Sequence, residues 1–193
     1  GGDFREIGNT YYDHLVAIRD GAVLTDWNPD PSSDVFALEF GGDGTLYAGG
    51  DFTSIGSEAR SHLAAFDGIG VLTGWNPGAS NDVWTLAVAS DGTVYIGGAF
   101  TEIANESRYR LAAVDSTGAL TSWAPVLNDR VYDLELAAGI DCLRDQHQIT
   151  STQPAAPTIT VDAQHIGLVT AAGVGSCRPG QLHVSFEPVP ARQ

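Results

Sequence analysis

Histidines and aspartates are the side chains of this sequence whose types could support metal chemistry. His14 and His62 occupy equivalent positions of a tandem repeat, one unit apart, and Arg110 holds the third such position. Imidazole is a common zinc ligand, but zinc requires its ligands to converge on one point. Equivalent positions in successive repeat units lie far apart, so we interpret both histidines as strand-surface residues. The remaining histidines are scattered through the C-terminal part: His147, His165 and His183.

Aspartates in loops make calcium a better match than zinc, because Ca²⁺ binds hard oxygen ligands. The calcium candidates are Asp30, Asp34, Asp43, Asp82 and Asp91. The sequence contains neither an EF-hand nor a nonapeptide calcium repeat. Aspartate is also favoured in tight turns for conformational reasons alone. Structural calcium and simple turn formation therefore both remain as interpretations of these residues.

Catalytic motifs are absent from the sequence. We find no nucleophile elbow, no HExxH motif, no phosphate-binding loop and no metal-spaced cluster of His and Cys. The sequence therefore predicts a protein without enzymatic activity and without a cofactor, structural calcium excepted.

Strong acidity restricts the class of partner. The 193 residues include 24 acidic and nine basic residues, and the net charge is −15. Such a charge repels nucleic-acid phosphates and anionic membrane surfaces, and no apolar run approaches the length needed to span a bilayer. We therefore expect neither nucleic-acid binding nor membrane insertion. The opening Gly-Gly-Asp-Phe, in place of Met, favours a processed or excised segment.

Cys142 and Cys177 are the only cysteines, and neither belongs to a CxxC motif. A disulfide between them would fit an oxidising compartment, and hence an extracellular or cell-surface protein. Two free buried thiols are the other interpretation.

A tandem repeat with a constant spacing of 48 covers residues 1–138. Paired glycines occur at residues 1–2, 49–50 and 97–98, and valines recur at Val35, Val83 and Val131. Large side chains keep the same spacing, and we expect them to pack between repeat units: Trp27, Trp75, Trp123, Phe4, Phe52 and Phe100.

Each unit contains four short segments with strand character, separated by Gly, Asn, Asp and Pro. In the best-preserved unit they are Asp82–Ala89, Thr93–Gly98, Arg110–Asp115 and Ala119–Trp123. The Asp-Gly pair between the first two segments predicts a hairpin, because it supplies the positive φ angles of tight β-turns. Four strands in about 40 to 50 residues are typical of a propeller blade. The predicted fold is all-β, with propeller-type repeats over residues 1–138, a linker over 139–157 and a C-terminal β segment over 158–193. The doubled glycines would permit a close approach of backbones.

The pattern within the repeat resembles the delta-60-type β-propeller repeat. The matching motifs are Tyr-x-Gly-Gly-x-Phe-Thr-x-Ile, then Arg-x-x-Leu-Ala-Ala, then Leu-Thr-x-Trp-x-Pro, and residues 46–77 and 94–125 carry them almost completely. The doubled glycine is shared with kelch repeats only in part. The resemblance implies a large secreted or surface protein of bacteria, without an established common activity.

Only two complete units are present, so a closed ring must be completed in some other way. The tail could supply strands, several chains could complete one another, or the chain could be a piece of a longer protein. We expect a structural or adhesive surface protein that assembles into oligomers or filaments through incomplete repeats and strand exchange. The alternative is a module of a larger secreted protein that binds glycans or proteins, with loop aromatics at Tyr11, Tyr12 and Tyr109 as glycan contacts.

Overall fold

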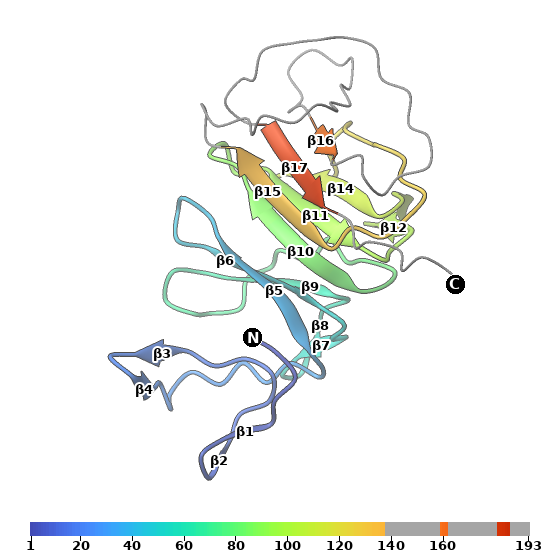
Figure 1. Cartoon of the computed structure of the whole chain (residues 1–193). Coiled ribbons are helices and arrows are strands. Elements are labelled where there is room, and N and C mark those ends of the chain that lie inside the picture. Colours follow the sequence, from blue (N-terminus) through green and yellow to red (C-terminus); the bar gives the residue numbers. More distant parts are fainter. Residues whose placement is uncertain (138–158, 162–180, 186–193) are drawn as a thin grey trace, which may run out of the picture.

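The computed structural model describes residues 1–137, 159–161 and 181–185, and every regular element within these ranges is a β-strand (Figure 1). The predicted all-β class is therefore confirmed for the described part of the chain. That part contains no helix that could cross a membrane.

Two sheets repeat each other strand by strand. The first is ordered β5 (Val35–Phe40), β6 (Leu46–Gly50) and β9 (Leu63–Phe66), and the second β10 (Val83–Val88), β11 (Val94–Gly98) and β14 (Leu111–Val114). All neighbouring strands in both sheets are antiparallel. Val35 pairs with Gly50 as Val83 pairs with Gly98, and an irregularity in register follows each pair. The spacing in sequence thus corresponds to equal positions in two sheets.

A tight turn joins the first two strands of each sheet, as the sequence predicts. In the first turn, the Gly41 N–H donates to the Thr45 carbonyl over 2.8 Å, and the Asp43 carboxylate accepts from the Thr45 N–H over 2.9 Å. Gly44 has a φ of 86°, which glycine adopts without steric cost. The predicted hairpin is confirmed, and the turn between β10 and β11 repeats it.

The predicted fourth strand of each unit is shorter than expected. Over Ala119–Trp123, Leu120 alone bridges to Val114, and the Thr121 N–H donates to the Ala113 carbonyl over 3.0 Å. Beyond this point the Trp123 side chain is buried, with its ring edge against Tyr95 at 5.3 Å between centroids. The pairing therefore ends where the tryptophan takes its place in the core.

Short hairpins that the sequence did not predict follow each phenylalanine of the repeat. They pair β1 (Glu6–Ile7) with β2 (Thr10–Tyr11), β7 (Ser54–Ile55) with β8 (Glu58–Ala59), and β12 (Glu102–Ile103) with β13 (Glu106–Ser107). A fourth hairpin pairs β3 (Ile18–Arg19) with β4 (Ala22–Val23). Strands of two residues are too short to produce an alternating pattern of polar and apolar residues.

A third sheet joins the repeat to the C-terminal part of the chain. β15 (Asp133–Ala137) pairs antiparallel with β17 (Gln181–Ser185), which pairs in parallel with β16 (Ile159–Val161). Residues 162–180 and 186–193 of the predicted C-terminal β segment, and the disulfide candidates Cys142 and Cys177, lie outside the described residues. β10 lies between β5 on one side and β15 on the other, so the first strands of the three sheets follow one another (Figure 1).

The core forms where one sheet packs on the next. Tyr47 and Leu63 of the first sheet share a buried cluster with Val83, Leu86 and Ile96 of the second. Fully burying a side chain of this size contributes about 1.5 to 3 kcal/mol. Contacts between units, in addition to those within a sheet, therefore stabilise the fold.

The tryptophans of the repeat lie at these junctions. The Trp27 Nε1–H donates to the Gly70 carbonyl over 2.8 Å, and the Trp75 Nε1–H donates to the Asp115 carbonyl over 3.4 Å, so each reaches into the following unit. Trp75 is buried against Tyr47, with 5.0 Å between ring centroids. Phe52 and Phe100 are fully buried, and Phe4 is half-buried.

The paired glycines leave room both for the next unit and for the neighbouring strand of the same sheet. A Cβ at Gly49 would collide with Val83 of the next sheet, and a Cβ at Gly97 would lie 2.7 Å from Val131. A Cβ at Gly50 would overlap the carbonyl oxygen of Asp34 on the neighbouring strand. The first glycine therefore admits the next unit, and the second admits the adjacent strand.

We expect Gly50→Ala to lower the free energy of unfolding by about 3 kcal/mol, because the overlapped Asp34 carbonyl belongs to the backbone and cannot rotate away. Gly42→Ala is the control, since a Cβ there meets nothing within 4 Å, and we expect a change below about 0.5 kcal/mol. Urea denaturation measures both variants. Equal stability of the two would contradict the steric explanation.

Candidate functional site

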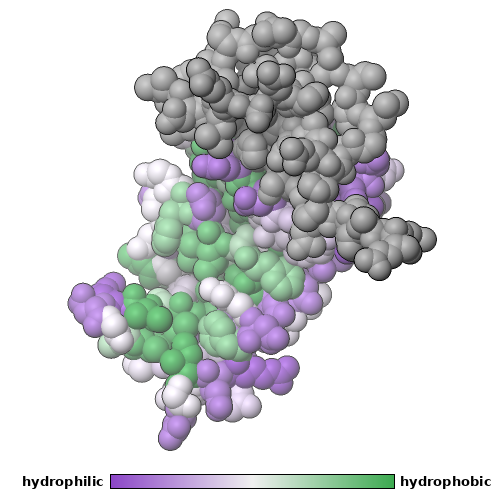
Figure 2. Space-filling view, viewed as in Figure 1, coloured by the Kyte–Doolittle hydropathy of each residue, from purple (hydrophilic) through white to green (hydrophobic). Residues whose placement is uncertain are grey.

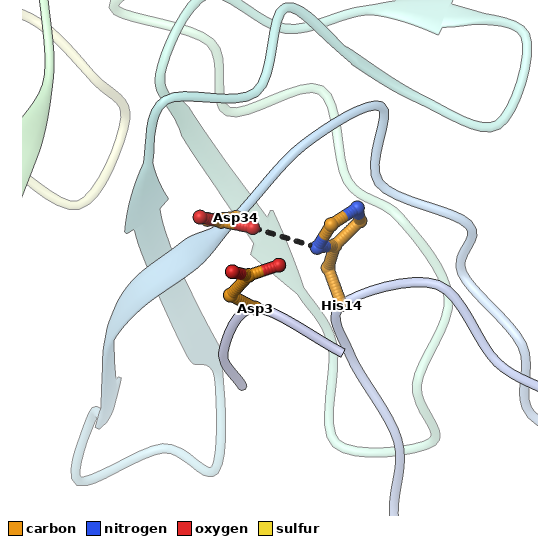
Figure 3. Close-up of side chains that lie close together, drawn as sticks. All are labelled: Asp3, His14 and Asp34. Atoms are coloured by element: carbon orange, nitrogen blue, oxygen red, sulfur yellow. Dashed lines mark ion pairs between the residues drawn. The ribbon is translucent and has the colours of Figure 1, made fainter. Parts of the chain in front are cut away.

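One group of side chains in the described part of the chain brings three potential metal ligands together. Ligand atoms of Asp3, His14 and Asp34 all lie within 4.8 Å of one another (Figure 3). The Nδ1 atom of His14 lies 2.9 Å from Oδ1 of Asp34 and 3.2 Å from the carbonyl oxygen of Gly2. His14 is buried, Asp34 is half-buried and Asp3 is exposed, so the group is reached from solvent on the Asp3 side.

Backbone hydrogen bonds fix the position of the histidine. The His14 N–H donates to the Phe4 carbonyl over 2.8 Å, and the Gly2 N–H donates to the His14 carbonyl over 2.9 Å. His14 has a φ of 59°, in the left-handed region that non-glycine residues seldom adopt. Asp34 is the residue directly before β5. The group therefore joins the N-terminal segment to the first sheet.

The two oxygens around Nδ1 of His14 determine the hydrogen-bonding role of that nitrogen in the arrangement observed. Both Asp34 Oδ1 and the Gly2 carbonyl are acceptors, so Nδ1 carries the hydrogen and donates it. Figure 3 shows the other ring nitrogen pointing away from both aspartates. In the opposite tautomer, the Nδ1 lone pair would face the two carboxylates, and the group could hold a cation.

The same corner recurs in the second unit with the same residue types. Asp51, His62 and Asp82 stand one repeat unit after Asp3, His14 and Asp34. Nδ1 of His62 again lies 3.2 Å from a carbonyl oxygen, that of Gly50, and the φ of His62 is 65°. Within the described ranges, however, His62 makes no ion pair within 4.0 Å, and Oδ1 of Asp51 is buried without a hydrogen-bond partner.

The third unit replaces all three residue types at once. Ala99, Arg110 and Arg130 stand where the first unit has Asp3, His14 and Asp34. Arg110 keeps the left-handed backbone, with a φ of 69°, and its Nη1 donates to the Phe100 carbonyl over 3.0 Å. The sequence made no prediction for Asp3. However, the three equivalent positions change residue type together between the first and third units, and this shared change could have identified them as one group.

The two histidines lie at separate junctions, as expected, but they do not both lie on strand surfaces. His14 is buried at the junction of the N-terminal segment with the first sheet, so its interpretation as a strand-surface residue is wrong. The reason is that His14 contacts Asp34 of its own junction. A ligand set therefore does not require the two histidines to meet.

The remaining calcium candidates lie in separate turns. Asp43 and Asp91 are bound within their own hairpin turns, each accepting from the N–H two residues later. Asp30 has a φ of 56° in a loop, where its carbonyl accepts from the Gly56 N–H over 2.8 Å. Among the described residues, Asp34 is the one calcium candidate that belongs to a group of three potential ligands.

The aromatic residues proposed as glycan contacts differ in their exposure. Tyr11 and Tyr109 are 69% and 45% exposed, whereas Tyr12 is only 4% exposed. The prediction of Tyr12 as a glycan contact is therefore wrong. The backbone N–H of Tyr12 donates to the Arg5 carbonyl, and this pairing holds Tyr12 inside the N-terminal segment.

A stacked aromatic pair was not anticipated from the sequence. Trp84 of β10 and Tyr132, directly before β15, occupy equivalent positions of successive units, and their rings stack at 4.6 Å between centroids. The guanidinium carbon of Arg130 lies 5.4 Å from the Trp84 ring centroid, a distance suited to a cation–π contact. The equivalence of Trp84 and Tyr132 within the repeat is the signal that could have found them.

Two shallow, open pockets border the Trp75 and Trp27 junctions. The first has a volume of about 230 Å³ and is lined by Asp43, Tyr47, Thr73, Trp75 and Thr117, among others. The second, of about 360 Å³, lies beside Trp27 and Ile55. The residues that line these two pockets include hydroxyl groups and carboxylates but no histidine or cysteine.

A match to a protein family covers two strands of the second sheet, β11 and β14. Residues 89–120 match a domain of unknown function described as a beta-propeller, DUF5122. These residues run from the turn before β11 to the bridge after β14. Comparison with curated proteins found no match. The match and the all-β structure support a propeller-type repeat.

We expect Thr45→Val to raise the pKa of Asp43. That pKa lies below its ordinary value because the carboxylate accepts hydrogen bonds from the Thr45 N–H and then from its hydroxyl over 3.0 Å. The variant removes only the second bond. A lowered pKa stabilises the fold above the ordinary value of the group, and this contribution is lost as pH falls through the lowered pKa. Carboxyl NMR titration measures the change.

Thr93→Val, in the equivalent turn, is the control and should leave the pKa of Asp43 unchanged. The same titration with calcium chloride tests the calcium hypothesis, because a cation bound to Asp43 would lower its pKa further. An unaltered pKa in Thr45→Val would contradict the hydrogen-bond explanation.

Proposed function

We propose that this chain is a non-enzymatic structural module of an extracellular or cell-surface protein, built from propeller blades whose open end is completed by a further blade. We also propose that its repeats are of the delta-60 type. The observation that supports the proposal most directly is an apolar face of β5, against which no sheet packs in the described structure.

Cross-strand pairs show which way this face points. Leu38 pairs with Ala48, which is buried in the cluster formed with the N-terminal segment, so both lie on the side of the preceding unit. Leu38 is 37% exposed and Phe40 is 68% exposed. Figure 2 shows hydrophobic surface gathered where β5 and the N-terminal segment lie in this view.

The second sheet shows how such a face is normally covered. Leu86, at the position of Leu38, is 6% exposed, and its partner Ile96 is fully buried, because the first sheet packs on them. The N-terminal segment covers only the outer part of the first sheet. The uncovered part of β5 therefore has the shape and character that accept a sheet of the same repeat.

A second copy of the chain is the occupant that we propose. Its last sheet, formed by β15, β17 and β16, lies at the opposite end of the row of sheets and could pack head to tail on β5 (Figure 1). Strands β16 and β17 reach this sheet from beyond residue 158, so tail strands are capable of completing a unit. Repetition of this contact would give oligomers or filaments.

The charge and the cysteines bear on this proposal in different ways. The net charge of −15 opposes association between copies of the chain, so the apolar face of β5 would have to supply the attraction between them. A disulfide between Cys142 and Cys177 is part of the same proposal, since it requires an oxidising compartment.

Light scattering and electron microscopy test the assembly. We expect the native chain to form oligomers or filaments, and Phe40→Glu to shift it to the mass of one chain, because a carboxylate would be buried at the contact. Ile69→Glu is the matched control, since Ile69 is 85% exposed in the turn after β9. A native chain that stays monomeric at high concentration overturns self-assembly.

The stacked pair Trp84 and Tyr132 favours a second candidate function, the binding of glycans, whose rings stack on aromatic faces. A glycan array would then show saturable binding that Trp84→Ala weakens by at least about tenfold, the equivalent of about 1.4 kcal/mol. Ile69→Ala is the control. Absence of binding by the native chain contradicts this candidate.

A further inference from the structure

We propose that Asp3, His14 and Asp34 bind a divalent transition-metal ion, with zinc as the best fit, at the junction between the N-terminal segment and the first sheet. This proposal does not depend on self-assembly. It concerns a site inside one chain.

The distances suit a shared cation. Two ligand atoms that each lie about 2.1 Å from a zinc ion are separated by about 3.0 to 3.4 Å when the angle between them is about 90° to 109°. Nδ1 of His14 lies 2.9 Å from Asp34 Oδ1 and 3.2 Å from the Gly2 carbonyl oxygen, and the ligand atoms of all three residues, that of Asp3 included, lie within 4.8 Å of one another. Small movements of side chains would place the donors around one ion.

The types of ligand favour zinc over calcium or magnesium. An imidazole nitrogen together with carboxylate oxygens is a common zinc set, whereas Ca²⁺ and Mg²⁺ prefer oxygen ligands alone. His14 would bind in the tautomer with hydrogen on Nε2, so that the Nδ1 lone pair faces the ion. The exposed Asp3 lies on the side of the group from which an ion can enter.

Electrostatics provide a second reason. Two carboxylates gather negative charge beside one imidazole at a site where His14 is buried. A divalent cation would neutralise that charge, and the chain as a whole carries a net charge of −15.

The later units give an independent observation. The third unit has neither carboxylate at this corner, and it carries Arg110 and Arg130 in place of His14 and Asp34. The unit without the potential ligands therefore has positively charged side chains at the same positions. In the second unit, Oδ1 of Asp51, the equivalent of Asp3, is buried without a hydrogen-bond partner. A buried carboxylate oxygen normally has a partner, so an aspartate at this position of the repeat is left short of a positive or hydrogen-bonding group.

The structural consequence is a link between two parts of the chain. Asp3 and His14 belong to the N-terminal segment and Asp34 to the start of β5, and that segment covers only the outer part of the first sheet. A bound ion would hold the segment in place, because it binds the folded arrangement and not the separated parts.

The experiment is zinc titration by calorimetry after removal of metals with a chelator. We expect the native chain to bind zinc, and the triple variant Asp3→Ala/His14→Arg/Asp34→Arg to lose at least roughly 100-fold in affinity. This variant installs the residue types of the third unit, which that unit accommodates in the same backbone. Circular dichroism verifies its fold, and Asp34→Asn provides a nearly isosteric second variant.

The matched control is the equivalent exchange in the second unit, Asp51→Ala/His62→Arg/Asp82→Arg, which should retain the site at the first junction. Cobalt substitution adds a readout, since loss of the cobalt absorption bands in the first-junction variants alone identifies these ligands. Failure of the native chain to bind zinc, or unchanged affinity in both the triple variant and Asp34→Asn, overturns the proposal. Neither outcome bears on self-assembly, which light scattering measures separately.

Discussion

The close approach of one sheet to the next is the constraint on which the rest of the structure depends. Val83 contacts the backbone at Gly49, and Val131 contacts it at Gly97, because a glycine provides no side chain at that point. The second glycine of each pair lets the neighbouring strand approach as closely from within the sheet. A unit of this repeat can therefore stack only if both glycines are kept, and its other large residues fill the space that this spacing leaves.

The junction that the glycines create also determines where functional groups can gather. The residue after the glycine pair, the residue before the third strand and the residue before the next first strand meet at one corner. In the first unit these are Asp3, His14 and Asp34, whereas the third unit has Ala99, Arg110 and Arg130. Packing fixes the backbone in each unit, so the side chains at this corner can change together without changing the fold.

Much of the fold followed from the sequence, but the candidate site did not. Regular spacing of glycine, valine and tryptophan predicted the sheets, and Asp-Gly turns predicted the hairpins, because these features depend on local geometry. The corner depends on which residues from three segments converge, and no local pattern reveals this. The sequence predicts Asp34 as a candidate calcium ligand and His14 as a strand-surface residue, and it makes no prediction for Asp3. Comparison of the three units, position by position, holds the missing information.

The close packing of one sheet on the next also explains which side chains are exposed at the end of the row of sheets. At an internal junction, Trp75 donates its Nε1–H to the next unit and Leu86 is covered by the preceding one. At the outer position of the first sheet, Leu38 is partly exposed. This end of the row thus presents an apolar group that an adjoining unit covers in the interior. A row of identical junctions has no intrinsic stopping point, so it ends where the ring closes, where a cap differs in sequence, or where another chain continues it. The exposed β5 face carries the apolar residues of the repeat itself, and not the polar face of a cap, which favours continuation.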